Sequence, residues 1–291
     1  IFSRKIRWKK IKTIFIPYTS NFEHSAFSFL LLKKLFNVDY VLHIHGGGLK
    51  TWQTAKLQNK FFKNAKKIAG VSIPVVKEYE KRTNRNVEYL PPLISFKKNE
   101  KTKIFFKKEK ALEQFNKIIL FVGSLKPIKA PEVLIKAFLL LGEEFIKNNK
   151  LGLLIVGDGI LRNDLQRAYS KHTNIIFTGK IPNEKVNEYY ALADIYVIPS
   201  FFEGTPVALI EAMFNALVCI GSNVSGISEI IQNKKNGFLF NVKDYNELSI
   251  ILKEVILNAS SSIKKGINAY KSYNSNFSYG IHLENFKKFI D

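Results

Sequence analysis

The sequence predicts an α/β fold built on parallel, doubly wound sheets, and three observations lead to this prediction. The chain has 291 residues, enough for a large core and two domains. Short apolar segments alternate with segments of helical periodicity, which is typical of parallel sheets covered by helices. Apolar residues make up 46% of the chain and charged residues 24%, so the composition is that of a globular protein.

The alternation is most regular in the second half of the chain. Strands are expected at 118–122, 153–156, 174–177, 195–198, 217–220 and 237–240. Helical patterns are found at 130–141, 160–170, 183–192, 206–214, 226–233 and 245–257. Ligands of such sheets bind at the carboxyl ends of the strands. The loops that follow Val122, Val156, Phe177 and Ile198 are therefore the candidate site.

The first half repeats the alternation in shorter pieces. Strands are expected at 13–16, 40–45, 67–72 and 87–90, and helices at 22–36, 50–66 and 73–81. Residues 96–116 are polar and rich in lysine, which predicts a linker or a basic insertion. We therefore expect a first domain at 1–95, a second domain at 117–275, and a C-terminal helix at 276–291 that returns to the first domain.

Composition narrows the possible function classes. The single cysteine, Cys219, lies in an apolar run, so neither a disulfide nor a zinc site can be built from cysteine alone. No apolar stretch approaches the roughly 20 residues that cross a bilayer. The chain begins at Ile1 and shows no signal-peptide pattern. We therefore expect a cytoplasmic protein.

Positive charge is concentrated in the first part of the chain. Residues 1–110 hold 25 Lys and Arg against 7 Asp and Glu, a net charge of +18, whereas the remaining residues hold 20 against 17, a net charge of +3. Aromatic residues interleave with the basic ones, which predicts peripheral attachment to an anionic membrane surface, on its inner face. The alternatives are a solvated surface in a lysine-rich protein and a nucleic-acid-binding module. We expect no specific nucleic-acid partner, because no recognition motif is present.

The run from Pro199 to Glu229 carries the clearest functional pattern. Glu203 precedes a Gly-Thr-Pro turn in which Thr205 is expected to cap a helix and Pro206 to take its first position. Glu211 is the only charge on that apolar helix. A buried carboxylate is costly unless it is paired or hydrogen-bonded, for example to ligand hydroxyls, and a helix start suits a phosphate. The pattern predicts a site for a sugar and a phosphate.

Each glutamate also has a structural interpretation. Glu203 alone would usually be a solvated loop residue, and Glu211 alone could be a core glutamate paired with a structural Lys or Arg. Another segment supports the functional interpretation, because Gly123, Ser124 and Lys129 lie between a predicted strand and a predicted helix. That order of elements suits contact with a phosphate.

The joint pattern S-x-x-E-G-x-P-x7-E, which starts at Ser200, resembles the donor-site signature of glycosyltransferase family 4. The resemblance implies the GT-B fold, in which two Rossmann-like domains face each other across a cleft. Nothing before Ile14 supplies the opening βα units of such a fold, so the resemblance also implies that the N-terminal domain is truncated and that this fragment is inactive or transfers poorly. The implied enzyme is a retaining, metal-independent glycosyltransferase of the hexosyltransferase type.

The resemblance also implies substrates. The donor would be a nucleotide sugar, with UDP or GDP as the most expected nucleotide, and no separate cofactor would be needed. The acceptor would be a carbohydrate or lipid-linked hydroxyl, in the synthesis of surface polysaccharide or glycolipid. The alternatives are another GT-B enzyme, such as a sugar-nucleotide epimerase or a phosphorylase, and an inactive relative of these enzymes.

Site residues follow from the same resemblance. Glu211 would hold the ribose hydroxyls, and Glu203 the hydroxyls of the donor sugar. Lys129 and the amides near Gly204, Thr205 and Pro206 would stabilise the leaving diphosphate. Lys129 matches the lysine of the family's G-R-L-x-x-x-K segment, which begins here at Gly123, whereas Ser124 stands where that segment has arginine.

The last predictions concern the two histidines His43 and His45 and the binding of a metal ion. His45 would polarise groups at the anomeric carbon, and His43 is expected to be a core residue. A metal held by this His-x-His pair lacks a third ligand nearby in the sequence. The chain also has no Asp-x-Asp pair, with which many other glycosyltransferases hold a divalent cation. We therefore expect no metal.

Overall fold

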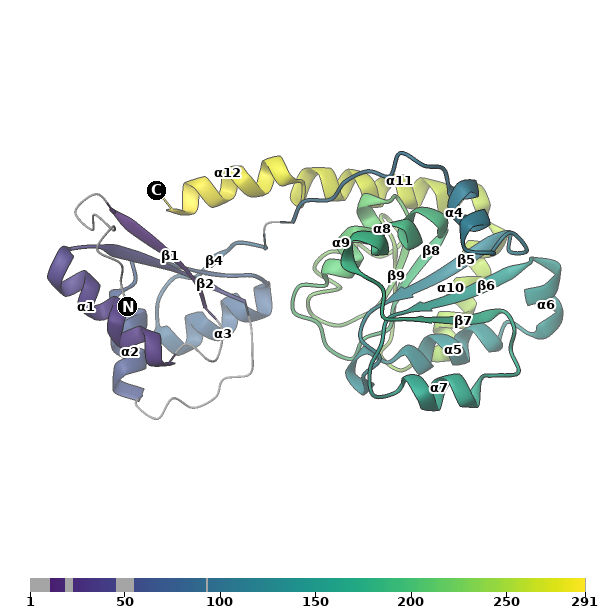
Figure 1. Ribbon diagram of the computed structural model, residues 1–291, viewed down its shortest axis with the longest axis horizontal. Coiled ribbons are helices and arrows are strands. Elements are labelled where there is room, and N and C mark those ends of the chain that lie inside the picture. The colour runs from purple at the N-terminus through teal and green to yellow at the C-terminus, as the bar shows by residue number, and fades with distance from the viewer. Residues whose placement is uncertain (1–10, 19–22, 46–54, 93, 291) are drawn as a thin grey trace. The chain divides into compact units, whose positions relative to one another are not determined.

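A computed structural model of the chain describes residues 11–18, 23–45, 55–92 and 94–290. The chain forms two compact units, which are described separately (Figure 1). Unit 1 comprises Ile1–Ile94 and Tyr279–Asp291, and unit 2 comprises Ser95–Ser278. Each unit has its own parallel sheet, which confirms the predicted α/β class.

Unit 2 contains a six-stranded sheet in the order β10-β9-β8-β5-β6-β7, and every pairing in it is parallel. Its strands are β5 (Lys117–Val122), β6 (Leu151–Val156), β7 (Ile175–Gly179), β8 (Ile195–Ile198), β9 (Val218–Ser222) and β10 (Phe238–Phe240). The winding reverses between the neighbours β5 and β8, because β6 and β7 lie on one side of this pair and β9 and β10 on the other. Such a switch point opens a crevice at the carboxyl ends of the strands.

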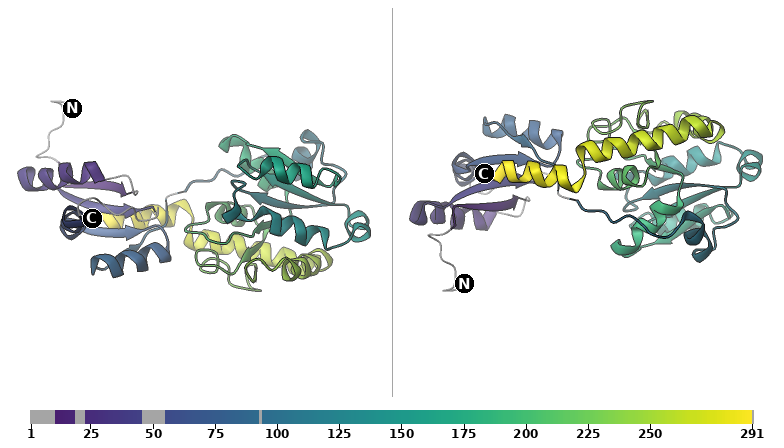
Figure 2. Two further views of the ribbon diagram at one scale, coloured as in Figure 1. Left: turned by 90° about the horizontal axis from the view of Figure 1, so that it is seen from below. Right: turned by 90° about the horizontal axis from the view of Figure 1, so that it is seen from above.

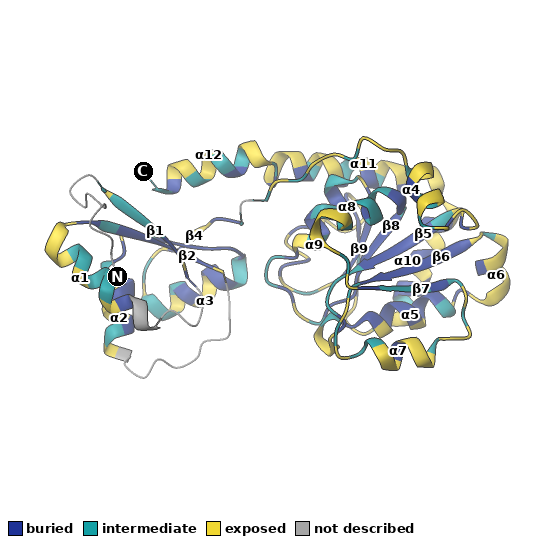
Figure 3. Cartoon of the chain, viewed as in Figure 1, coloured by how far each residue is buried: buried dark blue, intermediate teal, exposed yellow. Residues whose placement is uncertain are grey.

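Helices cover both faces of this sheet (Figure 2). They are α4 (Lys103–Glu109), α5 (Pro131–Leu139), α6 (Glu143–Asn148), α7 (Arg162–Ala168), α8 (Asn183–Leu192), α9 (Val207–Phe214), α10 (Tyr245–Leu257) and α11 (Ala259–Asn276), with a short 3₁₀ turn at Pro127–Lys129. The central strands of this sheet are almost wholly buried, whereas β7 at its edge is partly buried (Figure 3). Residues 96–116, predicted as a linker or insertion, belong to unit 2 and include α4.

One predicted helix of unit 2 is wrong. No helix forms at 226–233: residues 226–230 form turns, Asn233 forms a β-bridge with Gly237, and Gly226 has φ +88°. A Cβ at Gly226 would collide with the carbonyl oxygens of Glu203 and Gly204, so the chain turns sharply where it passes beneath that loop. Ile227 and Ile231 are both buried, and the Ile231 amide donates to the Ile227 carbonyl oxygen at 2.9 Å, so the segment has helical spacing locally although no helix forms.

Unit 1 contains four parallel strands in the order β1-β2-β3-β4. The strands are β1 (Thr13–Tyr18), β2 (Asp39–Ile44), β3 (Lys67–Gly70) and β4 (Glu88–Tyr89), and the helices are α1 (Glu23–Phe36), α2 (Ala55–Asn64), α3 (Ile73–Thr83) and α12 (Tyr279–Ile290). Helices α1 to α3 pack on one face, and α12 packs on the other through Phe286 and Phe289. The predicted helix at 50–66 is described only from Ala55, because residues 46–54 lie outside the described part of the chain.

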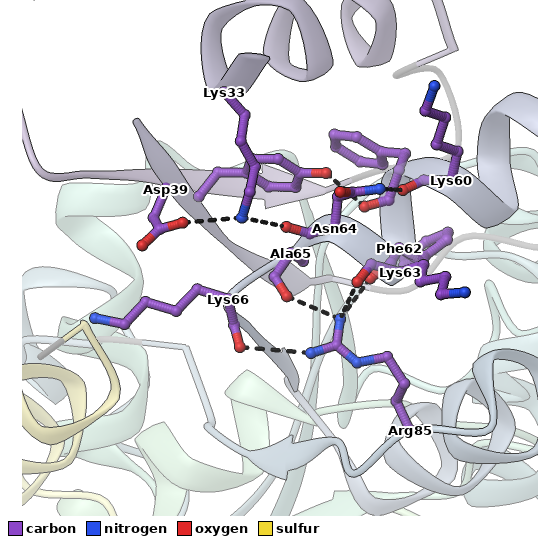
Figure 4. A network of polar contacts seen from close by, with 11 residues as sticks. Lys33, Asp39, Lys60, Phe62, Lys63, Asn64, Ala65, Lys66 and Arg85 are labelled. Atoms are coloured by element: carbon purple, nitrogen blue, oxygen red, sulfur yellow. Dashed lines mark hydrogen bonds and ion pairs between the residues drawn. The ribbon is translucent and has the colours of Figure 1, made fainter. Parts of the chain in front are cut away.

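Basic side chains of unit 1 bind the carbonyl end of α2 (Figure 4). Arg85 Nη1 donates to the carbonyl oxygens of Phe62 at 2.5 Å and Ala65 at 2.9 Å. Lys33 Nζ donates to the Asn64 carbonyl oxygen at 2.9 Å and pairs with Asp39 at the same distance. The last carbonyls of a helix have no partner within the helix, so these cations satisfy them. Some basic side chains of this unit therefore form hydrogen bonds and ion pairs within the unit.

Candidate functional site

The loops that follow β5 and β8 meet at the switch point of unit 2. The Phe201 amide donates to the Ile128 carbonyl oxygen at 2.8 Å and joins the two loops. The loop after β6 also approaches closely at Gly157, which has φ +137° and where a Cβ would collide with the Gly123 carbonyl oxygen. The topology thus brings together the segments that the sequence predicts as the candidate site.

Glu203 is buried, with 6% of its surface exposed, and both of its carboxylate oxygens are paired. Lys129 Nζ lies 2.7 Å from Oε1 and 2.8 Å from Oε2. Ser200 Oγ donates to Oε1 at 2.7 Å, and Ser222 Oγ donates in turn to the Ser200 carbonyl oxygen. A paired and hydrogen-bonded carboxylate can remain charged when it is buried. The Lys129 side chain is 31% exposed, so the ion pair is partly open to solvent.

Glu211 projects from α9 and has a different partner. The Tyr190 hydroxyl, from α8, donates to Glu211 Oε2 at 2.8 Å. Within the described residues, no Lys or Arg forms an ion pair with Glu211, so its interpretation as half of a structural ion pair is not supported. Burial raises the pKa of the Glu211 carboxyl, and the hydrogen bond from Tyr190 opposes that rise. The half-buried carboxylate keeps free lone pairs for further donors.

The turn between the two glutamates differs from its prediction by one residue. Helix α9 begins at Val207, with Pro206 as its N-cap, so Pro206 does not take the first helical position. Pro206 has φ −78° and ψ 81°, and the Val207 amide donates to the Thr205 carbonyl oxygen at 2.9 Å. These values describe an inverse γ-turn, which holds Pro206 outside the helix. Thr205 is the first residue of this turn, and Gly204 lies between it and Glu203.

Gly123 and Ser124 lie directly after β5. The Gly123 amide donates to the Val156 carbonyl oxygen at 3.0 Å and continues the pairing of β5 with β6. Ser124 is half-buried, in the same loop as Lys129. The structure therefore places this serine in the candidate site without the positive charge of an arginine.

His45 belongs to unit 1 and follows β2. Its ring packs edge-on against the His43 ring, with centroids 4.4 Å apart. His43 is buried and its Nε2 donates to the Leu90 carbonyl oxygen at 2.6 Å, as expected for a core residue. Burial lowers the pKa of His43 to about 4. The His45 side chain reaches solvent, but partial burial lowers its pKa as well, so both imidazoles are neutral at pH 7.

The structure brings Lys129 and Glu203 into contact and adds three residues that the sequence prediction did not include. Ser200 is the first residue of the S-x-x-E pattern, so its bond to Glu203 had a sequence signal. No sequence pattern indicated Ser222 or Tyr190, because Ser222 lies on β9 and Tyr190 on α8, away from the segments predicted to form the site. Across 11–18, 23–45, 55–92 and 94–290, no three His, Cys, Asp or Glu side chains gather closely enough to bind a metal ion.

Most of unit 2 matches a known protein family. The family described as glycosyl transferases group 1 matches residues 101–272, more than half of the chain. The chain is 31% identical over 173 residues to the UDP-Gal:α-D-GlcNAc-diphosphoundecaprenol α-1,3-galactosyltransferase of Escherichia coli; this match covers 53% of the chain and 42% of that protein. It is 30% identical over 176 residues to a diphosphoundecaprenol-linked glycan α-1,4-N-acetyl-D-galactosaminyltransferase of Campylobacter jejuni, over 60% of the chain and 47% of that protein. The chain thus spans less than half the length of these two relatives.

Solved structures resemble the chain over a greater length. HepE of Anabaena, crystallised with UDP, superposes on this chain with a TM-score of 0.79 at 14% sequence identity. The superposition covers 96% of this chain and 78% of the HepE chain. At this identity the likeness concerns the fold, which is GT-B, with two Rossmann-like parallel-sheet domains. The chain therefore belongs to the glycosyl transferases group 1 family.

Proposed function

We propose that the protein is a retaining glycosyltransferase that moves a hexosyl group from a nucleotide-sugar donor to an acceptor hydroxyl. One observation carries this proposal: a paired Lys129–Glu203 and a cation-free Glu211 lie on neighbouring elements of one site. The site forms at the switch point of unit 2, where doubly wound sheets bind nucleotides.

Each side chain has a role that its surroundings favour. The half-buried Glu211 carboxylate accepts hydrogen bonds from the two ribose hydroxyls. Lys129 stabilises the diphosphate, and Glu203 accepts hydrogen bonds from hydroxyls of the donor sugar. The amides of Gly204 and Thr205 and the start of α9 add donors for phosphate oxygens, while Gly123 and Ser124 border the same space.

The reaction that fits these roles is front-face transfer. The bond from the anomeric carbon to the diphosphate oxygen breaks, and a bond to the acceptor oxygen forms on the same face. The leaving phosphate takes the acceptor proton, so no separate base is required. Lys129 stabilises the charge that develops on the diphosphate, which is the electrostatic part of catalysis. The neutral imidazole of His45 polarises groups at the anomeric carbon, and no step uses a metal.

Names of similar proteins suggest the substrates. The E. coli and C. jejuni relatives are named for diphosphoundecaprenol-linked acceptors, and HepE was crystallised with UDP. We therefore propose a UDP-sugar donor, with a GDP-sugar as the alternative, and a lipid-linked or carbohydrate acceptor in surface polysaccharide or glycolipid synthesis. Such an acceptor would lie at a membrane surface, which fits peripheral attachment from the cytoplasmic side. No helix of the described residues has the length and hydropathy to cross a bilayer.

Nucleotide binding tests this proposal at its centre. UDP-, GDP- and ADP-sugars are screened by thermal shift, because a ligand that binds only the folded state raises the melting temperature. Glu211→Ala should then weaken binding of the preferred nucleotide about tenfold in calorimetry, since it removes charge-assisted hydrogen bonds. Glu254→Ala, which removes an exposed glutamate on α10, is the matched control and should leave affinity unchanged.

Two results would count against the proposal. Unchanged affinity in a folded Glu211→Ala variant would make this glutamate structural. Conversion of the donor in the absence of any acceptor would favour the epimerase alternative. Transfer itself is measured with radiolabelled sugar nucleotide and a diphosphoundecaprenol-linked acceptor.

A further inference from the structure

We infer that Tyr190 is a positioning residue for the donor: its hydroxyl holds the Glu211 carboxylate in the orientation that receives the nucleotide ribose. This inference rests on the proposed function, because it assigns a second residue to the same ribose contact. Tyr190 lies on α8, outside every segment that the sequence analysis assigned to the site.

The geometry of the contact supports orientation of Glu211. Tyr190 is 1% exposed, so its ring is fixed by packing. Its hydroxyl donates to Glu211 Oε2 at 2.8 Å. Glu211 comes from α9, whose first turn directly follows the loop that carries Glu203. A glutamate without such a contact would sample several side-chain rotamers and would lose that freedom when a ligand binds.

Counting lone pairs shows what remains for a ligand. A carboxylate offers about four acceptor positions, and Tyr190 occupies one of them, on Oε2. No other described residue donates to this carboxylate, so Oε1 and the second lone pair of Oε2 can accept from two vicinal ribose hydroxyls. The tyrosine hydroxyl has one proton, and the Ala208 carbonyl oxygen lies 3.1 Å away as a second acceptor. Tyr190 can therefore remain hydrogen-bonded in either protonation state of Glu211.

The surroundings of Glu211 give Tyr190 an electrostatic role as well. Among the described residues, the titratable groups whose charge interacts with Glu211 are Tyr190 on α8 and Tyr196 on β8, and neither is a cation. Burial therefore raises the pKa of the Glu211 carboxyl, and the Tyr190 hydroxyl is the group that lowers it. Its hydrogen bond favours the ionised form, which is the better acceptor for ribose.

The chain offers a matched control for this contact. Tyr196 is as fully buried as Tyr190, and the two ring centroids lie 5.8 Å apart. The Tyr196 hydroxyl, however, has no hydrogen-bond partner among the described residues. Tyr190→Phe and Tyr196→Phe thus remove the same atom from the same part of the core, but only the first removes a contact with Glu211.

The test is calorimetric titration of both variants with UDP and with 2′,3′-dideoxy-UDP, which lacks the two ribose hydroxyls. Tyr190→Phe should weaken UDP binding about three- to tenfold, the range expected for one hydrogen bond to a charged group, and should leave dideoxy-UDP binding unchanged. Tyr196→Phe should leave both affinities at the wild-type value. In Tyr190→Phe the loss of UDP affinity on acidification should also begin at higher pH, because Glu211 becomes easier to protonate.

Other outcomes would overturn the inference, and they differ from failure of the proposed function. Equal weakening of UDP and dideoxy-UDP by Tyr190→Phe would mean a general disturbance of the core. An unchanged UDP affinity in this variant, with Glu211→Ala still impaired, would leave the ribose role of Glu211 intact and remove that of Tyr190. If the wild-type chain binds none of the nucleotides or Glu211→Ala binds UDP normally, the proposed function itself fails.

Discussion

The carboxyl-terminal ends of the two parallel sheets hold buried ionisable side chains in opposite ways. In unit 2 the buried Glu203 is paired with Lys129 and also accepts a hydrogen bond from Ser200. In unit 1 the similarly buried His43 donates a hydrogen bond to the Leu90 carbonyl oxygen, and burial lowers its pKa to about 4. The loop after β8 therefore holds an ion pair in unit 2, whereas the end of β2 holds a neutral side chain in unit 1.

The difference shows what each unit can do chemically. A buried ion pair with an accessible lysine can exchange one of its partners for a phosphate or a sugar hydroxyl. A neutral imidazole can accept or donate a hydrogen bond but supplies no charge. These properties agree with the proposed function, in which unit 2 binds the diphosphate and His45 of unit 1 polarises uncharged groups. The four predictions below compare the two units, from the largest expected effect to the smallest.

Breaking the ion pair of unit 2 should have the largest effect. Lys129→Ala should lower the free energy of unfolding by about 2–3 kcal/mol, because it leaves Glu203 buried without a cation. This loss is smaller than the roughly 3–5 kcal/mol for a fully buried pair, because the Lys129 side chain is partly exposed. Urea denaturation measures the change. Lys126→Ala, in the same loop but exposed, is the matched control and should change stability little.

A double variant separates charge from packing. Lys129→Ala with Glu203→Gln should regain most of the lost stability, because the buried charge is gone, but should bind UDP as weakly as Lys129→Ala alone. If the double variant is no more stable than the single one, the ion pair does not explain the stability of this loop.

Acid should destabilise unit 1 through His43. The folded pKa, about 4, lies below the ordinary value of 6.5, so the unfolded chain takes up the proton first as the pH falls. The contribution of His43 to the free energy of unfolding is therefore fully present above pH 6.5 and declines as the pH falls toward 4. The free energy of unfolding should be lower by about 2 kcal/mol at about pH 5. Urea denaturation at several pH values, with the imidazole titration followed by NMR, measures this dependence.

His43→Gln is the control for that pH dependence. Glutamine keeps an N–H donor for the Leu90 carbonyl oxygen but does not titrate, so the decline between pH 6.5 and 4 should flatten in this variant. A decline of unchanged size would assign the acid sensitivity of unit 1 to other groups.

Adding a second cation to the site of unit 2 should sharpen its preference for diphosphate. Ser124→Arg should tighten UDP binding about tenfold and UMP binding much less, since an arginine can form charge-assisted hydrogen bonds to the additional phosphate. Calorimetry with both nucleotides gives the ratio. An equal change for UDP and UMP, or none for either, would show that this position does not face the diphosphate.

The smallest effect per residue is expected for the binding of the chain to anionic membranes. Vesicles with anionic lipid should bind the chain more tightly than neutral vesicles, and added salt should weaken the difference, because the Debye length is about 8 Å at physiological salt. Replacing the exposed Lys34 or Lys60 of unit 1 by alanine should cost up to about 1 kcal/mol each. Lys147→Ala, an exposed lysine of unit 2, serves as control, and equal binding to both kinds of vesicle would contradict the prediction.

Local sequence patterns determined most of the secondary structure. The predicted bounds of β8, α8 and α10 coincide with the observed ones. These elements are specified by short-range features, namely apolar runs for buried strands and helical spacing for helices that cover them. The segment 226–233 and the start of α9 were predicted wrongly, because a glycine with positive φ and a γ-turn are decided by neighbouring loops.

Only the tertiary structure decided how the site residues are paired. Lys129 and Glu203 are 74 residues apart, and Tyr190 contacts Glu211 from a different helix. The sequence determined by itself which residue types stand at the carboxyl ends of the strands, because that depends on local periodicity and loop chemistry. It could not determine which carboxylate receives the lysine and which the tyrosine hydroxyl. That choice depends on strand order and helix packing, which bring side chains together independently of their separation along the chain.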